Sequence, residues 1–246
     1  VEDDLGWHEQ GDGKLYCAVY VNMGRIENVA GGPQYRACFR EIAETLDLPL
    51  IVTPNTNVIF ADVDPAQKDS LNALLAKHGV VHAKEAGFTR ARQVAHACVA
   101  LPTCGLALSE SERVLPGFMD QIDATLKELG LENEPLLIRM TGCPNGCGRP
   151  YNADIGFVGR GPNKWAMFVG GSIRGNRLAG LEEKSVTGEE IPAKVRALLE
   201  AFKAERQEGE IFADWFGRTR ELGDAPSPEQ FHVELAERAA KLAATE

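Results

Sequence analysis

Residues 141–148 read TGCPNGCG, and a second cysteine segment, residues 97–104, reads ACVALPTC. Four of the six cysteines therefore fall in two pairs, C-x5-C and C-x3-C, with 38 residues between the pairs. Glycines flank the second pair, and glycine lets a backbone turn sharply and approach a bound group closely. The two segments predict loops that bring four thiolates together.

Four converging thiolates suit either a tetrahedral zinc ion or an iron–sulfur cluster. The two cysteines of a zinc knuckle usually have about two to four residues between them, so the five-residue spacer of the first pair is unusual for zinc. A cubane cluster is wider than one ion and is reached more easily by long spacers. The pattern favours an iron–sulfur cluster. A structural zinc domain and four ordinary buried thiols are the alternatives.

The chain around the cysteine segments alternates strands and helices. An apolar strand at 136–140 runs into the second cysteine segment, and strands at 155–159 and 165–169 follow it. Apolar residues at helical spacing predict helices at 116–129, with Phe118, Ile122, Leu126 and Leu129 on one face, and at 191–206. Ser227 followed by Pro228 predicts the start of a last helix that ends near residue 243.

The first part of the chain has a different pattern. Strands are expected at 15–21, 50–52 and 58–61, a helix from Pro33 to Leu46, and a second helix from Asp64 to Gly79. The order strand, helix, strand, strand, helix is most of a ferredoxin-like split βαβ motif. We therefore expect an α+β protein with a ferredoxin-like half-domain at 1–85 and a second, mixed α/β domain at 86–246.

Composition excludes several classes of function. Lys and Arg number 26 against 36 Asp and Glu, which gives a net charge of −10, whereas nucleic-acid binding needs basic surface. No apolar run approaches the ~20 residues that span a bilayer. Clustered cysteines in a chain of this length without a secretory signal predict a reducing compartment, hence the cytoplasm.

The residues around both pairs resemble those of the sirohaem-dependent sulfite and nitrite reductases. Residues 108–113, LSESER, follow the first pair, and Arg149 follows the second. The similarity extends to 53–57, TPNTN, and to 157–162, FVGRGP. Among the members of the family, the chain is most similar to the C-terminal half of the haemoprotein component of assimilatory sulfite reductase.

The resemblance implies a pair of cofactors. Cys98, Cys104, Cys143 and Cys147 would hold a 4Fe–4S cluster, and Cys147 would also bridge to the iron of sirohaem. The implied reaction is the six-electron reduction of sulfite to sulfide. Reduction of nitrite to ammonia is the near alternative, and a 4Fe–4S electron-transfer module without sirohaem is an alternative from a different class.

Further side chains are expected to contact the cofactors, although each of them could also have an ordinary structural role. Arg149 suits a sirohaem carboxylate and Asn145 a nearby hydrogen bond, although a surface ion pair and a turn residue are the simpler readings. The other candidates lie in a polar turn or on a short helix that could equally be solvated: Thr53, Asn55, Asn57, Arg90 and Arg92.

The resemblance covers only the second of two related halves. The basic residues that hold the sulfite anion in this family belong to the first half, so an N-terminal half of the same enzyme is the expected partner. Because this chain is acidic, the basic residues that bind an anionic substrate would have to come from another part of the enzyme. The expected electron donor is a flavoprotein reductase that uses NADPH, or ferredoxin. Neither nucleic acid nor a membrane is expected as a partner.

Overall fold

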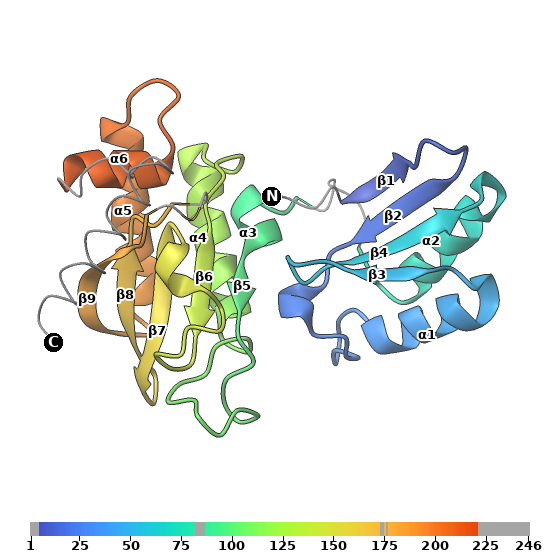
Figure 1. The fold of residues 1–246 in the computed structure, drawn as a ribbon, viewed down its shortest axis with the longest axis horizontal. Helices are drawn as coiled ribbons and strands as arrows, with labels where there is room; N and C mark the ends of the chain where they lie inside the picture. Colours follow the sequence, from blue (N-terminus) through green and yellow to red (C-terminus); the bar gives the residue numbers. More distant parts are fainter. Residues whose placement is uncertain (1–4, 82–86, 173–174, 176, 221–246) are drawn as a thin grey trace, which may run out of the picture. The chain divides into compact units, whose positions relative to one another are not determined.

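A computed structural model describes residues 5–81, 87–172, 175 and 177–220 (Figure 1). The chain divides into two compact units, residues 1–89 with 93–96 and residues 90–92 with 97–246. Each unit has its own sheet, so the protein is a mixed helix and strand fold, as the sequence predicts. Among the described residues, the helices are too short or too polar to cross a membrane.

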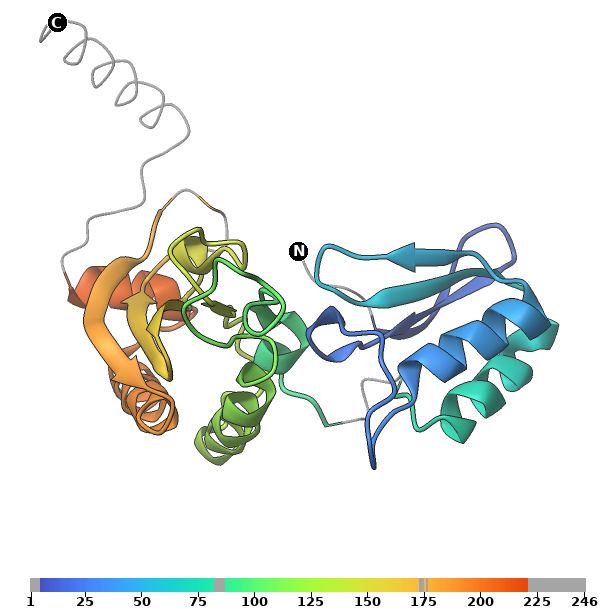
Figure 2. The same ribbon diagram turned by 90° about the horizontal axis from the view of Figure 1, so that it is seen from below.

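The first unit is a four-stranded antiparallel sheet in the order β1-β2-β4-β3. Two helices cover one face of it (Figure 2), and a short 3-10 turn, η1 (Asn22–Gly24), follows β2. The core lies between sheet and helices and includes Val19, Phe39, Ile42, Phe60 and Leu71. The elements are β1 (Gly6–Glu9), β2 (Leu15–Val19), α1 (Tyr35–Leu46), β3 (Leu50–Val52), β4 (Val58–Val63), η2 (Pro65–Gln67) and α2 (Lys68–Lys77).

The predicted order of strand, helix, strand, strand and helix is confirmed by β2 through α2. The split βαβ motif lacks its last strand in that order, and β1 fills the vacant place beside β2 with the register Gly6↔Ala18 to Glu9↔Leu15. The sequence analysis missed β1 because GWHE is short and has no apolar alternation. The N-terminal strand completes the sheet of the first unit.

The two solitary cysteines belong to the core of this unit. Cys17 on β2 and Cys38 on α1 are both fully buried. Burial raises the pKa of each thiol to about 12, so both remain protonated and apolar in character. Neither thiol is available as a thiolate ligand at neutral pH.

The second unit is a five-stranded mixed sheet in the order β5-β6-β7-β8-β9. β6 and β7 pair in parallel, and β7, β8 and β9 are antiparallel neighbours. Helices α4 and α5 lie side by side on one face (Figure 2). The elements are α3 (Arg90–Val94), β5 (His96–Ala97), α4 (Leu115–Leu129), β6 (Ile138–Thr141), η4 (Pro150–Asn152), β7 (Ile155–Gly161), β8 (Lys164–Val169), β9 (Gly180–Thr187), α5 (Ile191–Glu205) and α6 (Phe212–Thr219).

The strands and helices predicted for this unit are present, with differences in detail. The buried face of α4 consists of Leu115, Met119, Ile122 and Leu126, whereas the predicted Phe118 and Leu129 are only half-buried. Two described elements were not predicted: α6, and β9, whose sequence GLEEKSVT is mostly polar because the strand lies at the sheet edge. The predicted helix at 227–243 lies outside the described residues.

The parallel pairing of β6 with β7 forces the chain to cross back over the sheet between them. Residues 142–154 make this crossover, and the second cysteine pair lies on it. A Cβ atom on Gly156 would collide with the carbonyl oxygen of Pro150, and one on Gly159 would collide with that of Gly142. Glycine in β7 therefore lets the crossover lie directly on the strand.

Asp154, the last residue of the crossover, has a buried carboxyl group. Its side chain is 1% exposed, and its Oδ2 accepts a hydrogen bond of 2.7 Å from the Leu137 N–H. Burial raises the pKa of the Asp154 carboxyl to about 7, because the desolvated charge outweighs the hydrogen bonds it accepts. The folded chain therefore holds a proton here that an unfolded chain releases near pH 4.

We predict that Asp154→Asn flattens the pH dependence of stability. In the wild-type chain, the free energy of unfolding should fall between about pH 4 and pH 7, by a few kcal/mol at most, because only the unfolded state gains from ionisation in that range. The amide does not titrate. Urea unfolding at several pH values would check this, and an equal slope in both proteins would contradict it.

Candidate functional site

The two cysteine loops meet at the end of β6. The Cys98 sulfur accepts hydrogen bonds from the Gly142 N–H at 3.2 Å and from the Thr141 hydroxyl at 3.4 Å. The Cys98 N–H donates to the Met140 carbonyl at 3.1 Å. The first cysteine of the first pair therefore lies against the two residues that precede Cys143.

Gly142 holds the two loops together through its backbone. Its carbonyl oxygen accepts hydrogen bonds from the N–H groups of Leu108, at 2.8 Å, and Ser109, at 3.0 Å. A Cβ atom on Gly142 would lie 2.6 Å from the Ala100 Cβ and 2.7 Å from the Ser109 carbonyl oxygen. The sequence predicts glycine here for a turn, and the structure shows a second reason, since a side chain would push the loops apart.

Ser109 anchors the first loop to the sheet. It is buried, and its hydroxyl oxygen lies 2.6 Å from the Gly161 carbonyl oxygen and 2.9 Å from that of Lys164. These carbonyls belong to the last residue of β7 and the first residue of β8, on either side of the turn between the two strands. The sequence analysis gave Ser109 no role, and its only signal was its place in LSESER.

The four paired thiols differ in exposure. Cys143 is buried, Cys98 and Cys104 are intermediate, and Cys147 is exposed. Within the described ranges, no three His, Cys, Asp or Glu side chains converge closely enough to hold a single metal ion. Four thiols on two adjoining loops match the donor set of a group that is wider than one ion, which is the chemistry of a 4Fe–4S cluster. These residues therefore fit the implied cluster.

The structure brings Asn145 and Arg149 into the same loop as the second cysteine pair. Both are exposed, as is Cys147 between them. The loop is a tight turn, in which the Arg149 N–H donates to the Gly146 carbonyl at 2.7 Å. Arg149 itself has a φ of 54°, a left-handed conformation that fixes the start of η4.

Arg90 and Arg92 make contacts within their own unit. The Arg92 guanidinium is buried and forms ion pairs with Asp123 and, at 2.5 Å, with Asp120, both on α4. Arg90 donates to the Asn133 carbonyl at 3.3 Å. These contacts hold α3 against the α4 region and account for Arg92 without a cofactor. A cofactor contact of either residue remains a prediction.

Thr53, Asn55 and Asn57 lie in the turn between β3 and β4. The Thr53 hydroxyl oxygen accepts a hydrogen bond from the Asn57 N–H, and the Asn57 Oδ1 accepts one from the Val21 N–H, both at 3.1 Å. Asn57 is 1% exposed, and its amide connects the turn to the backbone that follows β2. A cofactor contact of these three residues also remains a prediction.

Arg139 is a charged residue that the sequence analysis did not single out. It lies on β6, its side chain is 7% exposed, and its Nε and Nη1 atoms are buried without a hydrogen-bond partner among the described residues. The sequence did mark this residue as unusual, because Arg139 is the one charged residue in the apolar run LLIRM at 136–140.

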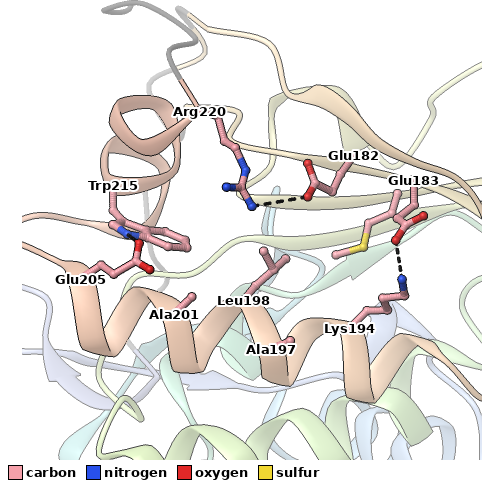
Figure 3. Close-up of a pocket in the computed structure, with 10 residues that line it drawn as sticks. Glu182, Glu183, Lys194, Ala197, Leu198, Ala201, Glu205, Trp215 and Arg220 are labelled. Atoms are coloured by element: carbon pink, nitrogen blue, oxygen red, sulfur yellow. Dashed lines mark hydrogen bonds and ion pairs between the residues drawn. The ribbon is translucent and has the colours of Figure 1, made fainter.

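A separate pocket of about 270 Å³ lies among β9, α5 and α6 (Figure 3). Four of its charged side chains form ion pairs, Glu183 with Lys194 and Glu182 with Arg220, and Glu205 accepts a hydrogen bond from the Trp215 indole. The uncharged lining residues are Trp215, Met167 of β8, and Ala197, Leu198 and Ala201 of α5. None of the predicted site residues lines this pocket.

Comparison with solved structures shows the same fold in a protein of known structure. The structure of the NirA protein of Mycobacterium tuberculosis matches with a TM-score of 0.72 and 22% sequence identity over 88% of this chain and 40% of that chain. At this identity, the likeness concerns the fold alone.

Curated proteins match at higher identity. The sulfite reductase [NADPH] hemoprotein beta-component of Methylobacterium nodulans is 42% identical over 94% of this chain and 38% of its own length. The sulfite reductase [ferredoxin] of Synechococcus elongatus is 44% identical over 88% of this chain and 34% of its own length. The chain thus spans little more than a third of the curated relatives it matches.

A family model matches the region that contains both cysteine loops. This model describes the nitrite and sulphite reductase 4Fe–4S domain, and the match runs over residues 96–241, more than half of the chain. The chain therefore belongs to the nitrite and sulphite reductase 4Fe–4S domain family.

Proposed function

We propose that the chain forms the cluster-bearing part of a sulfite reductase, which reduces sulfite to sulfide with six electrons. The observation that carries the proposal is the joining of the two cysteine loops, in which Gly142 donates to the Cys98 sulfur and accepts from Leu108 and Ser109. In this arrangement, Cys98, Cys104, Cys143 and Cys147 would hold a 4Fe–4S cluster.

Cys147 is the candidate for the shared ligand. It is the exposed member of the four thiols, so its sulfur can reach a group outside the loops while Cys143 remains inside. When bound, the cluster and sirohaem would pass electrons from the external donor to the substrate. The four cysteines would hold the cluster, and Asn145 and Arg149, which are exposed on either side of Cys147 in the sequence, would orient a bound macrocycle.

Much of the sulfite site would come from outside this chain. The net charge of −10 is poorly suited to collect an anionic substrate. In the first unit, β3 is an edge strand, and its residues Leu50, Ile51 and Val52 are 43%, 50% and 69% exposed. Exposed apolar edges are sites for pairing with another chain segment. The remaining part of a full-length relative is the proposed partner, and the cytoplasm, which keeps thiols reduced, is the proposed location.

The electron donor is either a flavoprotein that uses NADPH or ferredoxin. Relatives named for each donor match this chain at 42% and 44% identity. Both relatives are named sulfite reductases, which supports sulfite over nitrite as the substrate. An activity assay should therefore include both donors and both anions.

The cluster is tested by iron and labile sulfide content together with an anaerobic absorption spectrum. We predict that Cys98→Ser and Cys143→Ser each lower both contents at least about tenfold, because a cluster that loses a thiolate loses affinity beyond the effect of outer-shell partners. Cys17→Ala is the matched control, since Cys17 is a buried thiol of the first unit. Zinc without iron in the wild-type chain would overturn the proposal.

Cys147→Ser tests whether Cys147, unlike the other three cysteines, is a ligand that the cluster and sirohaem share. We predict that this variant loses the electronic coupling between cluster and sirohaem and, with it, sulfite reduction. The measurement is the electron paramagnetic resonance spectrum of the completed enzyme. Unchanged coupling and full activity in the variant would rule out the bridging role.

Gly142→Ala tests whether the close approach of the loops matters for the cluster. We predict a severalfold loss of iron and sulfide, because the added Cβ would overlap Ala100 and the Ser109 carbonyl. Gly105→Ala is the matched control in the first loop, where a Cβ atom meets nothing within 4 Å. Equal cluster content in the two variants would show that the contact is dispensable.

Sulfite reduction should depend on the part of the enzyme that this chain does not cover. We predict that adding the remaining part of the Methylobacterium nodulans relative increases sulfite reduction by the chain by at least about tenfold, because most of the anion-binding groups would come with it. Reduced methyl viologen serves as a donor that needs no partner protein. Equal activity with and without the added part would contradict the division of the site.

A further inference from the structure

Ala100 lies inside the first cysteine loop in a strained backbone conformation. Its φ is 46°, in the left-handed region that residues other than glycine rarely adopt. Its side chain is fully buried, and its Cβ would lie 2.6 Å from a Cβ atom on Gly142. A conformation of this kind persists only where the surrounding contacts hold it, and functional sites are where such contacts are most often found.

The strained residue sets the position of Cys104. The Cys104 N–H donates a hydrogen bond of 2.7 Å to the Ala100 carbonyl. Because a rotation about the Ala100 backbone would move this carbonyl, the conformation of Ala100 and the position of Cys104 are linked. The second thiol of the first pair therefore depends on a backbone conformation that an L-residue does not favour by itself.

Arg113 contacts the loop on both sides of Ala100. Its Nη1 donates to the Leu101 carbonyl at 2.9 Å and to the Val99 carbonyl at 3.4 Å. Its Nη2 lies 3.5 Å from the Thr103 hydroxyl oxygen. One guanidinium thus joins the peptide groups before and after the strained residue. Arginine holds its donors in a rigid planar fork, whereas the ammonium of lysine is a point charge on a flexible stem.

Glu112 holds both Arg113 and the first thiol residue of the pair. Its side chain is 8% exposed, and its Oε1 lies 3.2 Å from the Arg113 Nη1. The Glu112 N–H donates to the Cys98 carbonyl at 3.2 Å. Together with the bond from Cys104, these contacts give a donor to each backbone carbonyl from residue 98 to residue 101.

We propose that Arg113 is a positioning residue for the ligand pair Cys98 and Cys104. It holds Ala100 in the left-handed conformation, and the Ala100 carbonyl holds the Cys104 amide, so the loop has its ligand-bearing shape before a cluster binds. The inference rests on the proposed function, because the two thiols are ligands of the proposed 4Fe–4S cluster. Arg113 acts through the backbone of the loop and governs how readily the cluster loses iron.

The first arm of the test measures amide hydrogen exchange in the metal-free chain. We expect Arg113→Gln to make the amides of residues 99–107 exchange about tenfold faster, as for the loss of a hydrogen bond to a charged group. Arg113→Lys should restore part of the protection, because it keeps the charge without the fork. Arg196→Gln removes the same charge from an exposed, paired arginine on α5 and is the control.

The second arm uses the chain after anaerobic reconstitution with iron and sulfide, and measures the rate at which a chelator of ferrous iron removes the iron. We expect Arg113→Gln to raise this rate about tenfold, for the same reason as in the first arm. Arg113→Lys should be intermediate and Arg196→Gln equal to the wild type. Equal exchange in Arg113→Gln and Arg196→Gln would overturn the proposal, as would faster exchange in the loop without faster loss of iron.

Ala100→Gly tests whether Arg113 acts through Ala100. Glycine adopts a positive φ without a steric penalty, so the loop of this variant depends less on the guanidinium. We expect Arg113→Gln to speed iron loss less in the Ala100→Gly background than in the wild type. Additive effects of the two substitutions would contradict this route and overturn the proposal.

The failure of the proposed function would be distinguishable from the failure of this inference. A wild-type chain that binds no iron and sulfide would overturn the proposed function. Hydrogen exchange does not require the cluster, so the first arm would then decide whether Arg113 fixes the loop. A wild-type chain that binds both, with iron loss unaffected by Arg113→Gln, would overturn the positioning role alone.

Discussion

The parallel pairing of β6 with β7 is the constraint on which the rest of the second unit depends. Two adjacent parallel strands cannot be joined by a tight turn, so the chain has to cross the sheet between them. The crossover carries both cysteines of the second pair and Arg149. Because β7 has glycine at 156 and 159, this segment rests on the strand itself rather than on a layer of side chains. The same close contact shields Arg139 from solvent.

The first cysteine loop is held by polar contacts rather than by an apolar core. Hydrogen bonds from Cys98, Leu108 and Ser109 all end on the last residues of β6 or on Gly142. Ser109 adds a connection to the turn between β7 and β8. A site whose ligands are fixed by backbone geometry is organised before its cofactor binds. The exposure of the thiols then increases from Cys143, which is buried, to Cys147, which is exposed.

Much of this arrangement could be predicted from local sequence patterns. Apolar spacing predicted α1, α2 and α5, and the cysteine pairs predicted two loops, which meet at Cys98 and Gly142. The patterns failed for β1 and β9, which are edge strands with few apolar residues. They also could not predict the contacts that Ser109 and Arg92 make within the fold, because the partners of these residues lie 52 and 31 residues away in the chain. An isolated charge in an apolar run, as at Arg139, is visible in the sequence, but its surroundings are not.

The position of β1 has a consequence for how the protein is made. Because β1 fills the place that a strand after α2 would otherwise occupy, the first unit has its whole sheet once β4 has been synthesised, and its core once α2 follows. Domains generally fold as units from the N-terminus during synthesis. The first unit can therefore fold on the ribosome before the synthesis of the second unit, which contains the four paired cysteines, is complete.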